Sequence, residues 1–223
     1  MTNAGDAATR IKRWIVVIIV AMMVIDFIIA VSEGQWLNSF LILAIALLIL
    51  FVTTFSDRLV VQIPAEFQVV TLIFVFSALF LGEVRSYYDR FWWWDIALHG
   101  TSGLLTGILG FLLVYVLNES KRIALSMTPR FVAFFAFLFA VAVGALWEIF
   151  EFSIDSIFGA RMQKPMLGDP SGLTDTMWDM IINMIGAMLI SALGWWYMKR
   201  ARRSFIDIWI QKFIHKNPDW FHS

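Results

Sequence analysis

The sequence contains no cysteine, and only 15% of its 223 residues are charged. The lack of cysteine excludes a disulfide framework, a thiolate metal site and a cysteine nucleophile. The low charge argues against a water-soluble globular domain, in which ~25% of residues are charged. Lys and Arg together number 17, as do Asp and Glu, so a basic nucleic-acid-binding surface is not expected. What is present instead is apolar: 60% of residues are hydrophobic and the mean hydropathy is +0.77, which indicates an integral membrane protein.

Six apolar segments approach the ~20 residues that a membrane-spanning helix needs. The expected spans are residues 14–31, 37–55, 67–81 with an extension to 84, 92–117, 131–158 and 177–198. The expected fold is therefore an all-α polytopic bundle, with one transmembrane domain over residues 1–203. A cleaved signal peptide is the alternative for the first segment, which is longer than the ~7–15 apolar residues of a signal sequence. Residues 159–174 are rich in Pro and Gly and should form an irregular loop.

The Lys and Arg residues predict the orientation of the bundle. With the N-terminus in the cytoplasm, 13 of the 17 basic residues lie at cytoplasmic ends. The outer loops then hold only Arg85, Arg90, Arg161 and Lys164. Both termini should therefore be cytoplasmic.

Residues 204–223 form a cytoplasmic tail with a helical apolar pattern. Phe205, Trp209 and Phe213 recur every fourth residue, with lysines nearby. This pattern predicts an amphipathic helix on the membrane surface that ends at Pro218, and a disordered tail is the alternative.

Ionisable residues inside apolar spans are the main candidates for function, because a charge at the bilayer centre costs ~2.5–3.5 kcal/mol. The fourth span opens with Asp95 and His99, which are four residues apart and share one helix face. Asp95 could orient the imidazole while the other ring nitrogen binds a metal or moves a proton. The alternative is an Asp–His pair that only satisfies itself at the membrane edge.

The fifth span carries Glu148, Glu151 and Asp155 on one helical stripe, which Gly144 continues inward. No Lys or Arg lies among these carboxylates, so the usual explanation of a salt-bridged surface does not apply. Three unpaired carboxylates on an apolar helix require either protonation or a cation between them.

A third stripe enters the sixth span, where Asp175, Asp179, Asn183 and Gly186 share one face. Helix capping is an alternative explanation for Asp175. It does not explain Asp179, one turn further along. Asn183 could instead link helices through hydrogen bonds.

The predicted orientation places all three stripes in the outer half of the membrane. Asp26 in the first span and Glu83 at the end of the third lie at the same depth. We expect Asp26, Glu83, Asp155 and Asn183 to surround the site. The expected metal ligands are Asp95, His99, Glu148, Glu151, Asp175 and Asp179.

The motifs WDxxLHGxSG, ALWEIFEFxxD and DTxxDxxxNxxGA occur in this order. In this respect the chain resembles YjdF-type bacterial inner-membrane proteins and is more distantly similar to VanZ-like membrane proteins. The resemblance covers about residues 83–193. It implies a shared intramembrane acidic and histidine site, in which Glu151 is the least secure ligand because VanZ-like sequences often have Gln there. Some relatives are proposed to be metal-dependent membrane hydrolases.

Three functional hypotheses follow. The first is a hydrolase of a lipid or lipid-linked substrate that uses a divalent metal ion, with His99 or Glu148 as general base. The second is a cation- or proton-coupled transporter. The third is a structural or accessory membrane protein with a bound cation. The sequence lacks the G-x-S-x-G, HExxH and Walker A motifs of better-known enzymes.

Overall fold

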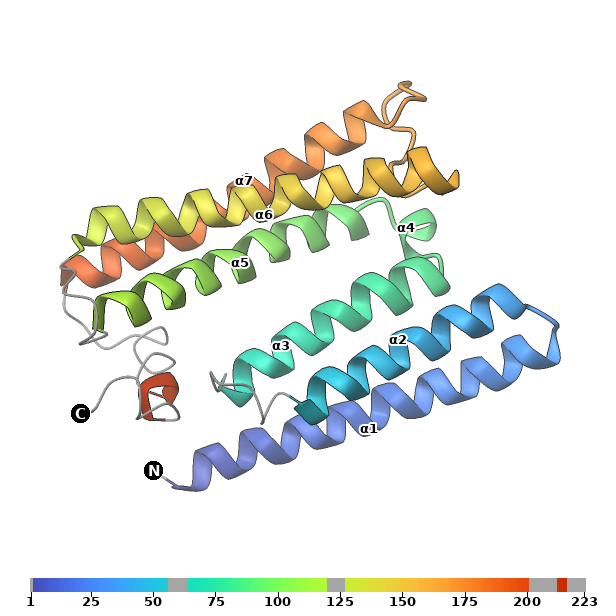
Figure 1. The fold of residues 1–223 in the computed structure, drawn as a ribbon, viewed down its shortest axis with the longest axis horizontal. Coiled ribbons are helices and arrows are strands. Elements are labelled where there is room, and N and C mark those ends of the chain that lie inside the picture. Colours follow the sequence, from blue (N-terminus) through green and yellow to red (C-terminus); the bar gives the residue numbers. More distant parts are fainter. Residues whose placement is uncertain (1, 56–63, 120–126, 201–211, 216–223) are drawn as a thin grey trace. The chain divides into compact units, whose positions relative to one another are not determined.

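The computed structural model describes residues 2–55, 64–119, 127–200 and 212–215, and their regular structure is helical (Figure 1). The chain divides into two compact units. Unit 1 comprises residues 1–91 together with 211–218, and unit 2 comprises residues 92–210 together with 219–223. Each unit contributes three helices that are long and apolar enough to cross a membrane. The structure thus confirms the all-α fold with six candidate spans.

Unit 1 contains α1 (Thr2–Ser32), α2 (Trp36–Phe55), α3 (Ala65–Val75), η2 (Phe76–Val84) and α4 (Tyr87–Arg90). A tight turn joins α1 to α2, and Gly34 adopts a φ of +70° there, which glycine accepts without strain. Met23 of α1, Ile49 of α2 and Phe80 of η2 are almost completely buried in one apolar core. Large apolar side chains on the outer faces of α1 and α2 remain exposed, as expected for helices in lipid.

The third span changes its helical geometry partway. α3 continues directly into η2, which is a π-helix. At its end the backbone N–H of Arg85 donates to the carbonyl oxygen of Phe80 at 3.0 Å. π-helical segments are rare and occur frequently at functional sites. The apolar pattern of residues 67–84 did not predict this feature, because hydropathy does not distinguish the two helix types.

Unit 2 consists of three long helices that all pack against one another: α5 (Trp94–Glu119), α6 (Pro129–Phe158) and α7 (Leu173–Arg200). Thr128 caps α6 by accepting a hydrogen bond from the backbone N–H of Phe131, and Pro129 occupies the first turn. α6 ends at Gly159, whose φ of +66° is typical of a helix C-terminus. An irregular loop follows up to α7, as the sequence predicted.

Glycines allow α5 and α7 to approach closely. A Cβ atom added at Gly103 would lie 2.1 Å from the carbonyl oxygen of Asn183, and one added at Gly186 would lie 2.3 Å from that of Gly100. Such contacts are possible only without side chains, and they are typical of membrane helix interfaces. This packing fixes the register of α5 against α7 at the level of the polar stripes.

Three predictions are not tested by these observations: the single transmembrane domain over residues 1–203, the cytoplasmic location of the termini and the amphipathic tail. Within the tail only residues 212–215 are described, and they are helical. Phe213 is buried there, and Lys212 forms an ion pair with Glu66 of α3. The remainder of the predicted tail helix lies outside the described residues.

Candidate functional site

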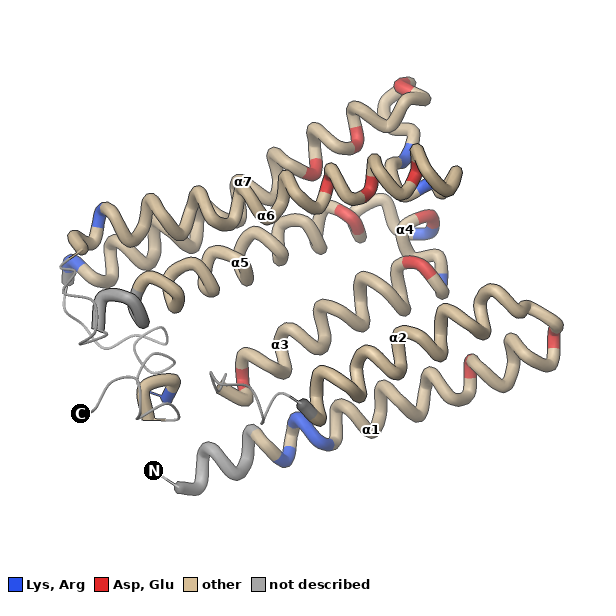
Figure 2. Tube along the Cα trace, viewed as in Figure 1, with Lys and Arg blue, Asp and Glu red and all other residues tan. Residues whose placement is uncertain are grey.

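Acidic residues gather at one end of unit 2. Figure 2 shows them where α5 begins, α6 ends and α7 begins. Basic residues mark the opposite end, with Arg130 at the start of α6 and Lys199 at the end of α7. Acidic residues outnumber basic ones at the first end, where Arg161 and Lys164 of the α6–α7 loop also lie.

His99 lies at the centre of the acidic end. Its Nε2 atom is 3.5 Å from Asp95 Oδ1 and 3.6 Å from Asp179 Oδ2. Its Nδ1 atom is 3.6 Å from Glu148 Oε1. Each helix of unit 2 thus contributes a carboxylate to one imidazole. The structure brings together four residues that the sequence placed on three separate stripes.

The separations around Nε2 are longer than those of ordinary hydrogen bonds. Ligand atoms from Asp95, His99 and Asp179 all lie within 4.8 Å of one another. Around a tetrahedral zinc ion with bonds of ~2.0–2.1 Å, neighbouring ligand atoms are about 3.3 Å apart. The observed spacing is therefore close to that of a metal ligand set, and small side-chain movements would complete it.

Glu148 is the most unusual member of the group. Its side chain is only 4% exposed, and neither carboxylate oxygen has a hydrogen-bond partner among the described residues. A buried carboxylate without hydrogen bonds is costly, because its lost hydration is not replaced. Such a group indicates a ligand, a proton or an ordered water at this position.

Asn183 lies on α7 one turn further from the acidic end than Asp179 and is 2% exposed. Its Nδ2 atom donates to the carbonyl oxygen of Ala140 on α6 at 3.2 Å, which is the interhelical link that the sequence offered as an alternative. A Cβ atom at Gly144 would lie 2.2 Å from this amide, so the glycine makes room for it. The Oδ1 atom of Asn183 has no partner among the described residues. The unpaired oxygens of Asn183 and Glu148 add to the polar character of the unit interior.

The two remaining predicted ligands have protein partners, and so does Asp155, which we expected to surround the site. Glu151 is 9% exposed and accepts a hydrogen bond from Trp147 Nε1 at 2.8 Å. Asp175 lies within the first turn of α7, not at its cap, and accepts from the backbone N–H of Lys164 at 2.7 Å. Asp155 accepts from the backbone N–H groups of residues 162 and 163 at 2.8 and 2.9 Å. The contacts of Asp155 and Asp175 attach the α6–α7 loop to the ends of these two helices.

Asp169 in the loop makes a contribution that the sequence analysis missed. Its carboxylate accepts hydrogen bonds from the backbone N–H and the hydroxyl groups of Ser171 and Thr174, all at 2.6–2.9 Å. These bonds, first of all that from the Ser171 hydroxyl, hold the pKa of Asp169 well below its ordinary value. Asp169 thereby anchors the start of α7. The D-x-S-x2-T spacing is the sequence signal that could have predicted this role.

Asp26 and Glu83 belong to unit 1, and their predicted contribution to the site in unit 2 stays a prediction. Within unit 1, Asp26 Oδ2 is 3.5 Å from Arg85 Nη1. The sequence analysis did not anticipate this ion pair, because it joins α1 to a residue 59 positions further along.

Comparisons with known proteins agree with the membrane fold. No solved structure matches the chain significantly. An uncharacterized protein of Thermotoga maritima is 28% identical over 144 residues, which is 65% of this chain and 68% of that relative. The model of one family, described as "Predicted membrane protein (DUF2238)", matches residues 11–200. This match is compatible with the YjdF-type resemblance and gives no support to the VanZ-like one. The chain belongs to the DUF2238 family of membrane proteins.

Proposed function

We propose that this protein is a metal-dependent hydrolase of a bacterial inner membrane that acts on a lipid or lipid-linked substrate. The observation that carries the proposal is the arrangement around His99. Two carboxylates lie beside its Nε2 atom, and a buried carboxylate without hydrogen bonds lies beside its Nδ1 atom. A divalent cation on the Nε2 side would be held by Asp95, His99 and Asp179.

The donor set fits such an ion. One imidazole nitrogen with several carboxylate oxygens suits Zn²⁺ or Mn²⁺, and the oxygens alone suit Mg²⁺ or Ca²⁺. A bound divalent ion would supply Lewis-acid activation of water and polarise a carbonyl or phosphoryl oxygen. Glu151 and Asp175 already accept hydrogen bonds from the protein, so they support this ligand set from outside.

Glu148 has two roles in this proposal. Its Oε1 lies 3.6 Å from Nδ1, so a small approach would let it accept a hydrogen bond from Nδ1–H and keep Nε2 directed toward Asp95 and Asp179, as in carboxylate–histidine–metal arrangements. Its other oxygen, Oε2, has no hydrogen bond from the described protein and would be available to accept a proton from water.

The surroundings favour an enzyme acting on lipid over a transporter. Trp147 and Phe150 of α6 and Trp178 of α7 are all more than 40% exposed, so lipid has access to the helices that carry the site. The rest of α7 has no Asp, Glu, His, Lys or Arg between Asp179 and Lys199. α5 likewise has none between His99 and Glu119, and α6 has none between Arg130 and Glu148. A proton or cation relay across unit 2 would need polar groups along this distance.

Metal binding is tested by elemental analysis of purified full-length protein in detergent. We expect about one divalent ion per chain in the wild type, and loss of most of it in Asp179→Asn and in His99→Gln. Ser191→Ala is the matched control, because Ser191 is also buried on α7 and its hydroxyl has no partner among the described residues. Equal metal content in the wild type and both site variants would contradict the proposal.

Hydrolysis is tested in proteoliposomes loaded with phospholipids and an isoprenoid-lipid diphosphate. Mass spectrometry should detect a lipid product that forms with wild-type protein, disappears with chelator and returns with added divalent ion. Glu148→Gln should abolish the product while retaining the metal if Glu148 acts mainly as a base. A product that forms equally with Glu148→Gln would refute its assigned role.

A further inference from the structure

A polar pocket opens at the end of unit 1 where α1 meets α2. It has a volume of about 230 Å³ and is lined by residues from α1, the α1–α2 turn, α2 and the end of η2. Pockets for drug-sized ligands measure ~300–1,000 Å³, so this one fits a chemical group of headgroup size. Its lining residues all belong to unit 1, and what it binds does not depend on the proposed function.

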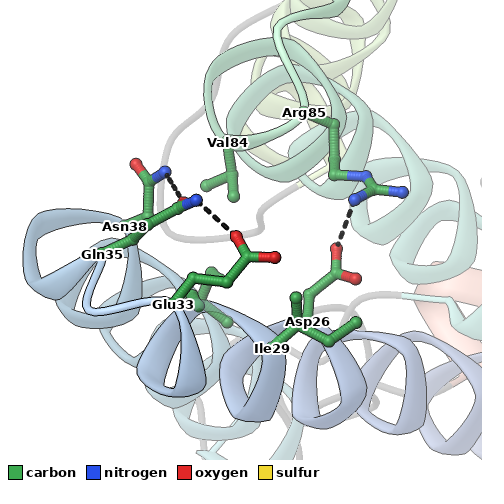
Figure 3. Close-up of a pocket in the computed structure, with 9 residues that line it drawn as sticks. Asp26, Ile29, Glu33, Gln35, Asn38, Val84 and Arg85 are labelled. Atoms are coloured by element: carbon green, nitrogen blue, oxygen red, sulfur yellow. Dashed lines mark hydrogen bonds and ion pairs between the residues drawn. The ribbon is translucent and has the colours of Figure 1, made fainter.

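The pocket carries charges of both signs. Asp26 and Glu33 are seven residues apart, so their side chains share one face of α1 and its C-terminal extension. Figure 3 shows both carboxylates directed into the same space, with the guanidinium of Arg85 facing Asp26. Ile29, Ile42 and Val84 provide apolar lining.

Much of the hydrogen-bonding capacity of these charged groups is not taken up by the described part of the protein. Arg85 makes one side-chain contact, at 3.5 Å to Asp26, and most of its five N–H donors have no acceptor among the described residues. Glu33 Oε2 accepts from Gln35 at 2.6 Å, while its Oε1 has no hydrogen bond from the described chain. Asn38 donates to Gln35 at 2.8 Å, which holds the amide toward Glu33. Two carboxylates against one guanidinium leave one negative charge without a cation.

We propose that this pocket binds the phosphoethanolamine headgroup of a membrane phospholipid. The phosphate meets the open side of the Arg85 guanidinium, and the primary ammonium meets the carboxylates of Glu33 and Asp26. Both contacts are charge-assisted hydrogen bonds, which are the stronger kind. The apolar lining lies beside helices that the chain places in lipid, so the acyl chains leave the pocket along them.

The donor pattern distinguishes this headgroup from its relatives. A choline headgroup has a quaternary ammonium without N–H donors, so it cannot hydrogen-bond to Glu33. A glycerol headgroup has no cation, and a pocket with excess negative charge disfavours an anionic lipid. Free phosphoethanolamine carries the same charges but gains nothing from the apolar lining.

The test is native mass spectrometry of the full-length protein in detergent, titrated with phosphatidylethanolamine, phosphatidylcholine and phosphatidylglycerol of identical acyl chains. We expect phosphatidylethanolamine to bind at least tenfold more tightly than the other two. Glu33→Gln and Arg85→Gln should each reduce this affinity at least tenfold. Arg90→Gln is the matched control, because Arg90 is an exposed arginine of α4 that does not line the pocket.

Arg85→Gln removes the ion pair of Asp26, so the double variant Asp26→Asn/Arg85→Gln serves as a second test without an unpaired carboxylate. It should fold and still lose the phosphatidylethanolamine preference. Equal affinities for the three lipids would overturn the proposal, as would unchanged affinity in Glu33→Gln. Free phosphoethanolamine binding as tightly as the lipid would overturn the assignment to a membrane phospholipid.

Discussion

Neutralising Asp179 tests whether the carboxylates around His99 form a metal site or only stabilise the bundle. Asp179 is 2% exposed, and no hydrogen bond to its side chain is present in the described structure. Asp179→Asn therefore changes the charge of the site while leaving its shape and its neighbours' hydrogen bonds intact. We expect this variant to fold, and we expect its stability to depend on divalent ions differently from that of the wild type.

The electrostatic terms in ion-free protein nearly cancel. With an effective dielectric constant of about 20, attraction to a protonated His99 at 3.6 Å is worth about 4.6 kcal/mol. Repulsion from Asp95, whose oxygen lies within 4.8 Å, costs at least about 3.5 kcal/mol. Glu148 and Asp175 lie at the same end of the unit and add to the repulsion. With chelator present, Asp179→Asn should therefore be at least as stable as the wild type.

Added divalent ions should then raise the thermal stability of the wild type but not that of Asp179→Asn. At a concentration one hundred times its dissociation constant, a ligand stabilises the folded state by about 2.7 kcal/mol. For a chain of this length that raises the apparent Tm by roughly 5–11 °C. Wild-type protein should show this increase in a thermal unfolding assay in detergent, and Asp179→Asn should show almost none.

The reasoning fails if Asp179→Asn is clearly destabilised both with and without chelator. That result would mean that Asp179 stabilises the bundle itself, and a removed partner in a buried polar set costs ~1–3 kcal/mol. Asp155→Asn is the control for a purely structural carboxylate. Both oxygens of Asp155 accept backbone N–H groups of the loop, so its variant should lose stability under both conditions.

Three further predictions address packing, pH and orientation. Gly103→Ala should destabilise the protein by about 1–3 kcal/mol in thermal unfolding, because its Cβ would overlap the α7 backbone, whereas Gly100→Ala has room and should be neutral or better. The lowered pKa of Asp169 contributes stability that is present above the ordinary Asp pKa and is lost as pH falls through the lowered value. Hydrogen-exchange protection of the Thr174 amide should therefore persist on acidification below the ordinary Asp pKa of about 3.9, and loss of protection around that pH would contradict the assignment. A reporter fused after Ser223 should be active only in a cytoplasmic assay, and periplasmic activity would reverse the predicted orientation.

Span boundaries and helical stripes could be read from the sequence with little loss. The span predicted over residues 131–158 is Pro129–Phe158 in the structure, and the span predicted over 177–198 is Leu173–Lys199. An apolar run of this length has one stable form in lipid, because every backbone group must be bonded within the helix. The i, i+4 spacing of Asp95 and His99 likewise required only the helical period, so their adjacency followed from local geometry.

Tertiary structure alone decided which carboxylates face His99. On the stripe of α6, Glu148 turns to the imidazole, while Glu151 is engaged by Trp147 and Asp155 by the loop backbone. These three residues look equivalent in the sequence because a stripe specifies a face and not what lies opposite it. What lies opposite depends on the register between helices, which is set by close contacts such as Gly103 against α7, and on loop hydrogen bonds between distant residues. The same limit applies to the ion pair of Asp26 with Arg85, since the π-helical turn that positions Arg85 leaves no trace in the apolar pattern.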